Sequence, residues 1–111
     1  MRYIPLRTVQ IENAPDFEYA EAIRTVIRQP LDSQRGVSID EMRRGIRILD
    51  KLDASTDILE LEDADYDHLK AKVEVMQWGM VERNLLDFID TVLGAKEAGS
   101  NNGLVAPAKV M

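Results

Sequence analysis

The sequence contains no cysteine, which excludes disulfide bonds, thiolate metal sites and a cysteine nucleophile. No apolar run approaches the roughly 18 residues that a membrane-spanning helix requires, and the first residues lack the apolar segment of a secretory signal. The glycines are scattered, so there is no glycine-rich phosphate-binding loop. These absences favour a cytoplasmic protein and argue against several large classes of enzyme.

Histidine is also scarce, and His68 is the only one in 111 residues. A catalytic triad would need a nucleophile and an acid that converge on it, and no nucleophile motif such as G-x-S-x-G is present. With Asp67 and Lys70 close by in the sequence, His68 is predicted to be a surface residue. We therefore expect a protein that is not an enzyme, with no catalytic residues, no cofactor, no metal and no small-molecule substrate.

One acidic segment has the spacing of a calcium-binding loop. Asp63, Asp65, Asp67 and Glu74 stand where that loop places carboxylate ligands. However, His68 occupies the place of the glycine that permits the sharp turn, and the apolar spacing predicts that the segment is already helical. We interpret these acids as residues of a first helical turn, where they complement the positive end of the helix dipole.

Charge is unevenly distributed along the chain, whose net charge is −6. Residues 24–51 carry seven basic side chains against four acids, whereas residues 53–67 carry seven acids and no base. One interpretation is a pair of solvated faces of opposite sign. The other is a dipolar surface that stacks subunits head to tail. The first is the default, because surface charge runs usually carry no specific function.

The first half of the chain predicts an extended arm and two helices. Residues 1–12 suit an edge strand or arm, because Pro5 cannot occupy a central strand position. Residues 13–16 offer a helix start, and Gln29-Pro30 ends that helix. Ser38 to Glu41 forms a capping box that starts the second helix. The residues of this helix expected to face the core are Ile39, Met42, Ile46, Leu49 and Leu52.

The second half predicts a short strand, two more helices and a tail. Residues 58–61 alternate as a strand would, and a third helix follows from about Asp63 to a corner at Trp78-Gly79. The fourth helix runs from about residue 81 to 93, and residues 95–111 have the composition of a flexible tail. We therefore predict a mainly α fold with about four helices around one core. Residues 3–9 and 58–61 leave room for a small two-stranded β element, and residues 1–94 form a single domain.

The fourth helix has two apolar stripes. One contains Leu85, Phe88 and Val92, and the other contains Leu86, Ile89 and Leu93. One modest core should cover only the first stripe, so Phe88 is predicted to be core, and Leu86 and Leu93 are predicted to lie at or near a protein–protein surface. Trp78 is either an anchor for a partner at the same surface or part of the core.

The second helix carries a basic cluster of Arg43, Arg44 and Arg47. A helix-turn-helix protein places such a helix in the major groove. The cluster lacks a neighbouring Asn, Gln or aromatic base reader, acids interleave with it, and the net negative charge argues against nucleic acid. A solvated basic face is therefore preferred, and a small DNA-associated regulator is kept as the alternative.

Residues 37–93 resemble small α-helical proteins encoded in the late, morphogenetic gene clusters of tailed bacteriophages and prophages. The resemblance is carried by Leu61-Glu62-Asp63-Ala64-Asp65-Tyr66, Leu69, Val73, Trp78 and Phe88-Ile89-Asp90. It implies an accessory or assembly factor for the phage head or tail that acts by protein contacts without catalysis. Its partners would be other phage structural or assembly proteins, or further copies of itself. It would act in the host cytoplasm or be incorporated into the virion.

Overall fold

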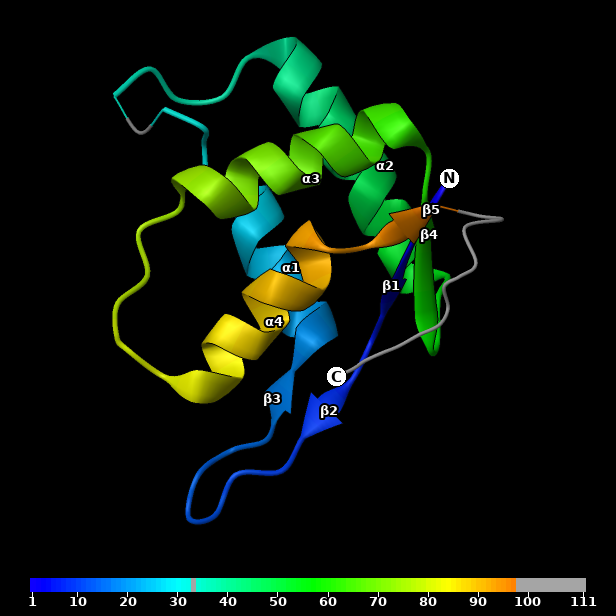
Figure 1. Ribbon diagram of the computed structural model, residues 1–111. Coiled ribbons are helices and arrows are strands. Elements are labelled where there is room, and N and C mark those ends of the chain that lie inside the picture. Colours follow the sequence, from blue (N-terminus) through cyan, green and yellow to red (C-terminus); the bar gives the residue numbers. More distant parts are fainter. Residues whose placement is uncertain (33, 98–111) are drawn as a thin grey trace.

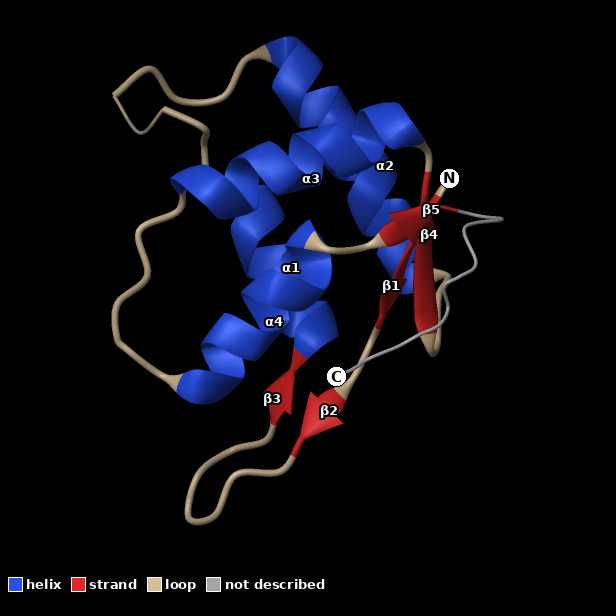
Figure 2. Cartoon of the chain, viewed as in Figure 1, coloured by secondary structure: helices blue, strands red, loops and turns tan. Residues whose placement is uncertain are grey.

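The computed structural model describes residues 1–32 and 34–97, and four helices in these ranges pack around one core (Figures 1 and 2). The helices are α1 (Tyr19–Arg28), α2 (Ile39–Asp53), α3 (Asp63–Val75) and α4 (Arg83–Leu93). The strands are β1 (Arg2–Pro5), β2 (Thr8–Val9), β3 (Phe17–Glu18), β4 (Ile58–Leu61) and β5 (Lys96–Glu97). The predicted fold class is confirmed. No helix in the described part of the chain is long and apolar enough to cross a membrane.

The N-terminal strand β1 lies at the centre of a three-stranded antiparallel sheet, between β4 and β5. Ile4 pairs with Leu59, and Pro5 pairs with Ile58 at the end of the ladder, where a missing N–H does the least harm. The predicted pairing of the arm with residues 58–61 is thus confirmed. It stops at Pro5, because β2 pairs with β3 instead. The predicted edge position is wrong, because β5 pairs with Arg2 and Tyr3 on the other side of β1, a ladder that ends before Pro5.

The helix start predicted at residues 13–16 is wrong. These residues belong to the connection between β2 and β3, where Asn13 adopts a positive φ of 63°. Asn tolerates this left-handed conformation, so the same residues that suit a helix cap also suit a turn. The helix α1 begins at Tyr19, whose N–H donates to the carbonyl of Arg7 at 2.9 Å. Its predicted end before Pro30 is confirmed, since α1 stops at Arg28.

The core fills the space between the helices and the sheet. Tyr19 of α1 and Phe88 of α4 are both fully buried and meet edge to face, with ring centroids 5.2 Å apart. This geometry is favourable for two aromatic rings and adds to the free energy of burial. Phe88 is therefore core, as predicted. The other fully buried large side chains are Ile4, Ile23, Val26, Ile48, Leu52, Leu59, Leu61, Tyr66, Leu69 and Val73.

The predicted core face of α2 is confirmed for Leu52, which is buried, and Leu49 packs against the core, but it is wrong for Ile39, Met42 and Ile46. Ile39 is 72% exposed and Ile46 is 52% exposed, whereas the helix buries Gly45, Ile48 and Leu52. The reason is the close approach of α1: a Cβ added to Gly45 would lie 3.3 Å from Cγ2 of Ile27. Because the two helices meet at the glycine, the most apolar stripe of α2 is left on the outside.

The C-terminal part of the fold extends past α4. Gly94 follows the helix as predicted, Ala95 is buried, and β5 pairs with β1. The hydroxyl of Tyr66 on α3 donates to the carbonyl of Val92 at 2.8 Å, which fixes the end of α4. The rest of the predicted tail, residues 98–111, lies outside the described residues.

Candidate interaction surfaces

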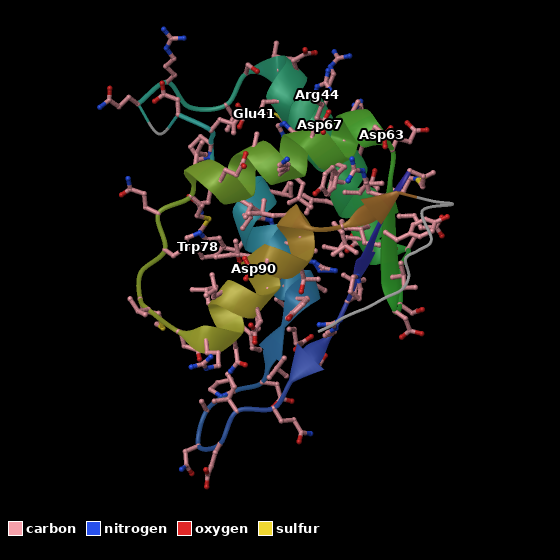
Figure 3. The ribbon with its side chains drawn as sticks, in the orientation of Figure 1. Glu41, Arg44, Asp63, Asp67, Trp78 and Asp90 are labelled. Atoms are coloured by element: carbon pink, nitrogen blue, oxygen red, sulfur yellow. The ribbon has the colours of Figure 1, made fainter. Side chains whose placement is uncertain are left out.

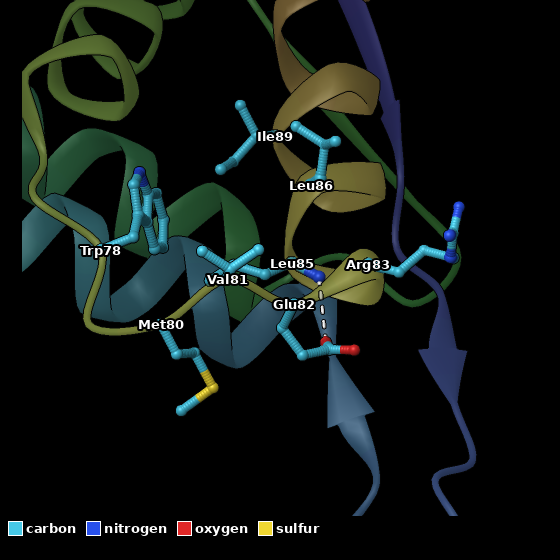
Figure 4. A pocket seen from close by; sticks show the side chains of 8 residues that line it. All are labelled: Trp78, Met80, Val81, Glu82, Arg83, Leu85, Leu86 and Ile89. Carbon is cyan, nitrogen blue, oxygen red and sulfur yellow. Dashed lines mark hydrogen bonds between the residues drawn. The ribbon is translucent and has the colours of Figure 1, made fainter.

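An open apolar pocket of about 400 Å³ lies between the α3–α4 loop and the first turns of α4 (Figure 4). Its lining residues are Trp78, Met80, Val81, Glu82, Arg83, Leu85, Leu86 and Ile89. Val81 is fully exposed and Leu86 is 56% exposed. Exposed apolar side chains gathered round one hollow are more informative than single ones, because they mark a surface that a partner can cover. We call these eight residues the α4 pocket.

Two local features shape the α4 pocket. Glu82 caps α4, because its Oε1 accepts a hydrogen bond from the N–H of Leu85 at 3.3 Å. Trp78 is half-buried, and its ring meets Phe88 of the core edge to face at a centroid distance of 6.4 Å. The cap engages the carboxylate of Glu82, and Arg83 points away from the other lining side chains (Figure 4). The interior of the pocket is therefore apolar.

Acidic side chains flank the α4 pocket. Asp87 and Asp90 are both exposed on α4, where Figure 3 labels Asp90. Asp90 is one helical turn beyond Leu86, so the two side chains are neighbours on the helix surface. Neither aspartate has an ion-pair partner within residues 1–32 and 34–97. Arg83, which lines the pocket, is one turn before Asp87 on α4, so the edge of the pocket carries charges of both signs.

A second open apolar surface runs along α2. Val37, Ile39, Met42 and Ile46 are all exposed, and we call these four residues the α2 face. A hollow of about 440 Å³ lies along it, and Arg43 is among the residues that line this hollow. Three of these four side chains have the spacing of a buried helix face, which is why the sequence predicts them to be core.

Basic side chains flank the α2 face. Arg28 lines a separate hollow of about 190 Å³ together with Val37 and Met42, whereas Arg43 lines the hollow of about 440 Å³. Both arginines are exposed, and neither has an ion-pair partner in the described part of the chain. Asp40 and Asp50 are also exposed on α2, and Asp50 is one turn beyond Ile46, so the α2 face is bordered by charges of both signs.

The predicted basic cluster is divided by the fold. Arg43 and Arg47 line the same hollow, but Arg44 is not among its lining residues and is half-buried. Arg47 forms an ion pair with Asp65 of α3 at 3.1 Å, and this contact raises its pKa. A DNA backbone would have to compete with that carboxylate for Arg47. Arg43 is thus the member of the cluster that is both exposed and unpaired among the described residues.

Lys72 is a buried residue of α3 that contacts both α1 and α2. Its side chain is 3% exposed, and its ammonium donates to the carbonyls of Ile27 at 2.6 Å and Gln29 at 2.7 Å, at the end of α1. It also forms an ion pair with Glu41 of α2 at 3.1 Å. Glu41 accepts a further hydrogen bond from the N–H of Leu31 at 3.0 Å. A cation at the negative end of a helix is favourable, and each of the three N–H donors of the ammonium has an oxygen acceptor.

Of the two hydrogen bonds predicted for the capping box, one is present and the other is not. The hydroxyl of Ser38 accepts from the N–H of Glu41 at 3.1 Å, as predicted. The carboxylate of Glu41 does not reach back to Ser38, because Lys72 and Leu31 hold it. Burial alone would raise the pKa of Glu41, but the hydrogen bonds from Lys72 and Leu31 outweigh it and hold the pKa below its ordinary value.

His68 is buried, which contradicts its predicted surface position. It lies one turn before Lys72 on the side of α3 that packs on α2, and its Nε2 has no hydrogen-bond partner among the described residues. Burial and the charge of Lys72 lower the pKa of His68 below its ordinary value. The neutral form of the imidazole therefore predominates at pH 7.

The acids at the start of α3 take part in ion pairs. Asp63 accepts from the N-terminal ammonium of Met1 at 3.0 Å, and Asp65 binds Arg47. Both are in the first helical turn, as predicted from the apolar spacing. Within residues 1–32 and 34–97, no three His, Asp or Glu side chains gather in a way that could hold a metal ion.

The predicted interaction residues differ in their surroundings. Leu86 and Trp78 line the α4 pocket, whereas Leu93 is half-buried, packs against the core and is not among the lining residues. Sequence reasoning missed Met80, which follows the predicted corner at Gly79 and has no periodicity to reveal it. In comparisons with protein-family models, curated proteins and solved structures, no match to this chain was found.

Proposed function

We propose that this protein acts without catalysis, by binding another protein through the α4 pocket. The observation that carries the proposal is the pocket itself, in which Leu86, Val81 and Met80 stay exposed around a half-buried indole although the core beneath is complete. Covering such side chains is favourable by about 25 cal/mol per Å² of apolar surface. A partner that inserts apolar side chains would gain this free energy.

The chemistry of the pocket favours a protein partner over a small metabolite. Sites for small molecules combine apolar walls with a few polar groups that orient the ligand. Here the carboxylate of Glu82 is engaged in capping α4, and Arg83 points outward. The remaining walls can accept aliphatic or aromatic side chains but can orient few polar groups.

The partner class that we propose is a structural or assembly protein of a tailed bacteriophage. The support for this class is the resemblance of residues 37–93 to small helical proteins of phage morphogenetic clusters. In this role the protein would be an accessory factor of head or tail assembly in the host cytoplasm, or a component of the virion. Binding through a preformed surface suits such a role, because little conformational order has to be gained on association.

Pairwise co-purification tests the proposed function. The tagged protein is co-expressed with each product of the genes next to its own, and capture is compared between the natural chain and Leu86→Asp. A matched control is Ile58→Asp, since Ile58 is 51% exposed on β4 and lies outside the α4 pocket. We expect capture of a capsid or tail protein that Leu86→Asp abolishes and Ile58→Asp preserves. Equal capture by all three chains would exclude the α4 pocket as the binding surface.

A further inference from the structure

The strand β4 is an outer strand of the three-stranded sheet, and it pairs with β1 on its inner side. Just past the end of this ladder, the N–H of Leu6 donates to the carbonyl of Asp57 at 2.7 Å. Hydrogen-bonded and non-hydrogen-bonded pairs alternate along an antiparallel ladder, so this bond fixes which residues of β4 face β1. Leu59 belongs to a hydrogen-bonded pair, whereas the N–H and C=O groups of Ile58 and Glu60 point away from β1.

The same register explains why a proline is tolerated in β1. Pro5 lies opposite Ile58 in a non-hydrogen-bonded pair, so its missing N–H costs no hydrogen bond with β4. On the outer side of β4, the backbone groups of Ile58 and Glu60 form no hydrogen bond with any residue in the ranges 1–32 and 34–97. The N–H donors and C=O acceptors of both residues are therefore available to a further strand.

A hollow of about 340 Å³ lies between β4 and the end of α2. Ile58 is 51% exposed, and Glu60 is exposed as well. Natural proteins commonly protect an outer strand with a proline or a bulge, and residues 58–61 contain neither. We call the outer side of β4 together with this hollow the β4 edge. The residues that line the hollow are Lys51, Ala54, Ser55, Thr56, Ile58 and Glu60.

Exposed acids outnumber bases beside the β4 edge. Asp57, Glu60 and Glu62 are all exposed, and none of them forms an ion pair with another described residue. Lys51 is the single base among the residues that line the hollow. These three acids and one base leave the β4 edge with a net negative charge.

Other basic groups near β4 already have acidic partners of their own. Arg2 and the ammonium of Met1 lie 3.9 Å and 3.0 Å from the carboxylate of Asp63, at the start of α3. Arg24 forms an ion pair with the end of α2 at 2.7 Å, and Arg47 forms one with α3 at 3.1 Å. The negative charge of the β4 edge is therefore available to a basic partner.

We propose that the β4 edge binds an extended, basic segment of a partner protein, which adds a strand to the sheet beside β4. Backbone hydrogen bonds with Ile58 and Glu60 recognise the extended conformation of this segment. Its lysine or arginine side chains lie next to Glu60 and Asp57, and these pairs give the preference for a basic sequence. No residue that lines this hollow also lines the α4 pocket, so the inference goes beyond the function proposed above.

The same acids disfavour a second copy of this chain as the occupant. Pairing of two β4 edges would bring Asp57, Glu60 and Glu62 of both copies together, and like charges on adjacent strands are destabilising. Charged side chains on an outer strand also protect it against unspecific pairing with other strands. The β4 edge therefore discriminates against itself and favours a strand of opposite charge.

Titration of the isotope-labelled full chain with two peptides, followed by NMR, tests this inference. One peptide is a capped hexapeptide of alternating lysine and valine, and the other has glutamate in place of lysine. We expect the lysine peptide to shift the amide resonances of Ile58 and Glu60 saturably. It should also slow the hydrogen exchange of these two amides, because their N–H groups become hydrogen-bonded. The glutamate peptide should bind about tenfold more weakly or not at all.

Three substitutions at position 60 separate the backbone contribution from that of the charge. Glu60→Pro removes the outward N–H but no hydrogen bond to β1, since Glu60 forms a non-hydrogen-bonded pair with Tyr3. Glu60→Val removes the charge and keeps the N–H, and we expect it to weaken binding of the lysine peptide about fivefold. Glu60→Pro should bind more weakly than Glu60→Val, although both are uncharged. Glu60→Lys should bind the glutamate peptide better than the natural chain does.

Several outcomes would overturn the inference. They are no saturable shift with either peptide, equal affinity for both peptides, and equal binding by Glu60→Pro and Glu60→Val. If Glu60→Pro does not fold, the exchange rates of the Ile58 and Glu60 amides in the natural chain decide the question. The proposed function is tested through Leu86 and this inference through Glu60, so either can fail while the other stands.

Discussion

Lys72 places a charged group at the point where α1, α2 and α3 meet. Its ammonium binds the carbonyls of Ile27 and Gln29, and its ion pair with Glu41 ties the start of α2 to the same point. Burying an ion is costly unless its hydrogen bonds are complete, and here all three donors have an acceptor. The contribution of this cluster is to fix how the three helices are oriented.

We expect Lys72→Met to lower the free energy of unfolding by about 3–5 kcal/mol, because it leaves the largely covered carboxylate of Glu41 without its cation. Urea denaturation of Lys72→Met, Glu41→Gln and the double variant measures the coupling. The double variant should lose less than the sum of the single losses, since no unpaired charge remains. Losses that simply add, or a loss below about 1 kcal/mol for Lys72→Met, would show that the pair does not hold the helices together.

His68 makes stability depend on pH in a defined direction. Its pKa is lowered in the folded state, so the unfolded chain takes up a proton first as the pH falls. Stability should therefore be constant above the ordinary histidine pKa of about 6.5 and decline below it, until the lowered pKa is passed. Glu41, whose pKa is also lowered, adds a separate loss only near and below its ordinary value of 4.5.

We predict that His68→Gln removes the decline between pH 6.5 and 5. Urea unfolding of both chains at pH 8, 7, 6 and 5 gives the comparison, and this range keeps the contribution of Glu41 nearly constant. Parallel curves for the two chains would mean that His68 titrates normally and is not buried in solution.

At the scale of single elements, α2 and α4 show when the spacing of apolar residues is sufficient to predict which face of a helix is buried. On α4, Phe88 is the largest apolar side chain and lies on the stripe that the core covers, so its burial could be predicted. On α2, the stripe containing Ile39 and Ile46 has the same helical spacing but is exposed. The deciding residue is Gly45, which lets α1 approach from the other side. Periodicity identifies an apolar face, but it does not say whether a neighbouring helix covers it.

The two sides of α4 should respond differently to substitution. Phe88→Ala should cost about 3–5 kcal/mol of stability, because it removes the ring that Tyr19, Trp78 and Phe17 all contact. Leu86→Asp should leave the fold and its melting temperature nearly unchanged, since the side chain is mostly exposed. Circular dichroism during thermal unfolding distinguishes them. Unfolding of Leu86→Asp at room temperature would place both apolar stripes of α4 in the core.

Over the whole molecule, contacts between distant parts of the chain determine strand pairing and helix packing, which local sequence patterns do not predict. In the pairing of β1 with β5, Tyr3 lies opposite Lys96. The two-residue β5 is too short to show the apolar alternation from which a strand is predicted. The guanidinium of Arg2 stacks on the ring of Tyr66 at 4.7 Å and donates to the carbonyl of Ala95 at 2.8 Å. The four helices could be predicted from local spacing, whereas the α4 pocket and α2 face depend on how those helices are assembled.

The last prediction tests whether the N-terminal strand is integral to the fold. Ile4 is fully buried at the centre of the three-stranded sheet, so Ile4→Ala should lower the free energy of unfolding by about 2–5 kcal/mol. The neighbouring Tyr3 points to the opposite face of the strand and is exposed, so Tyr3→Ala should cost less than about 1 kcal/mol. Urea denaturation monitored by circular dichroism provides both values. Equal and small losses would mean that β1 is a detachable arm, and that the core between helices and sheet closes without it.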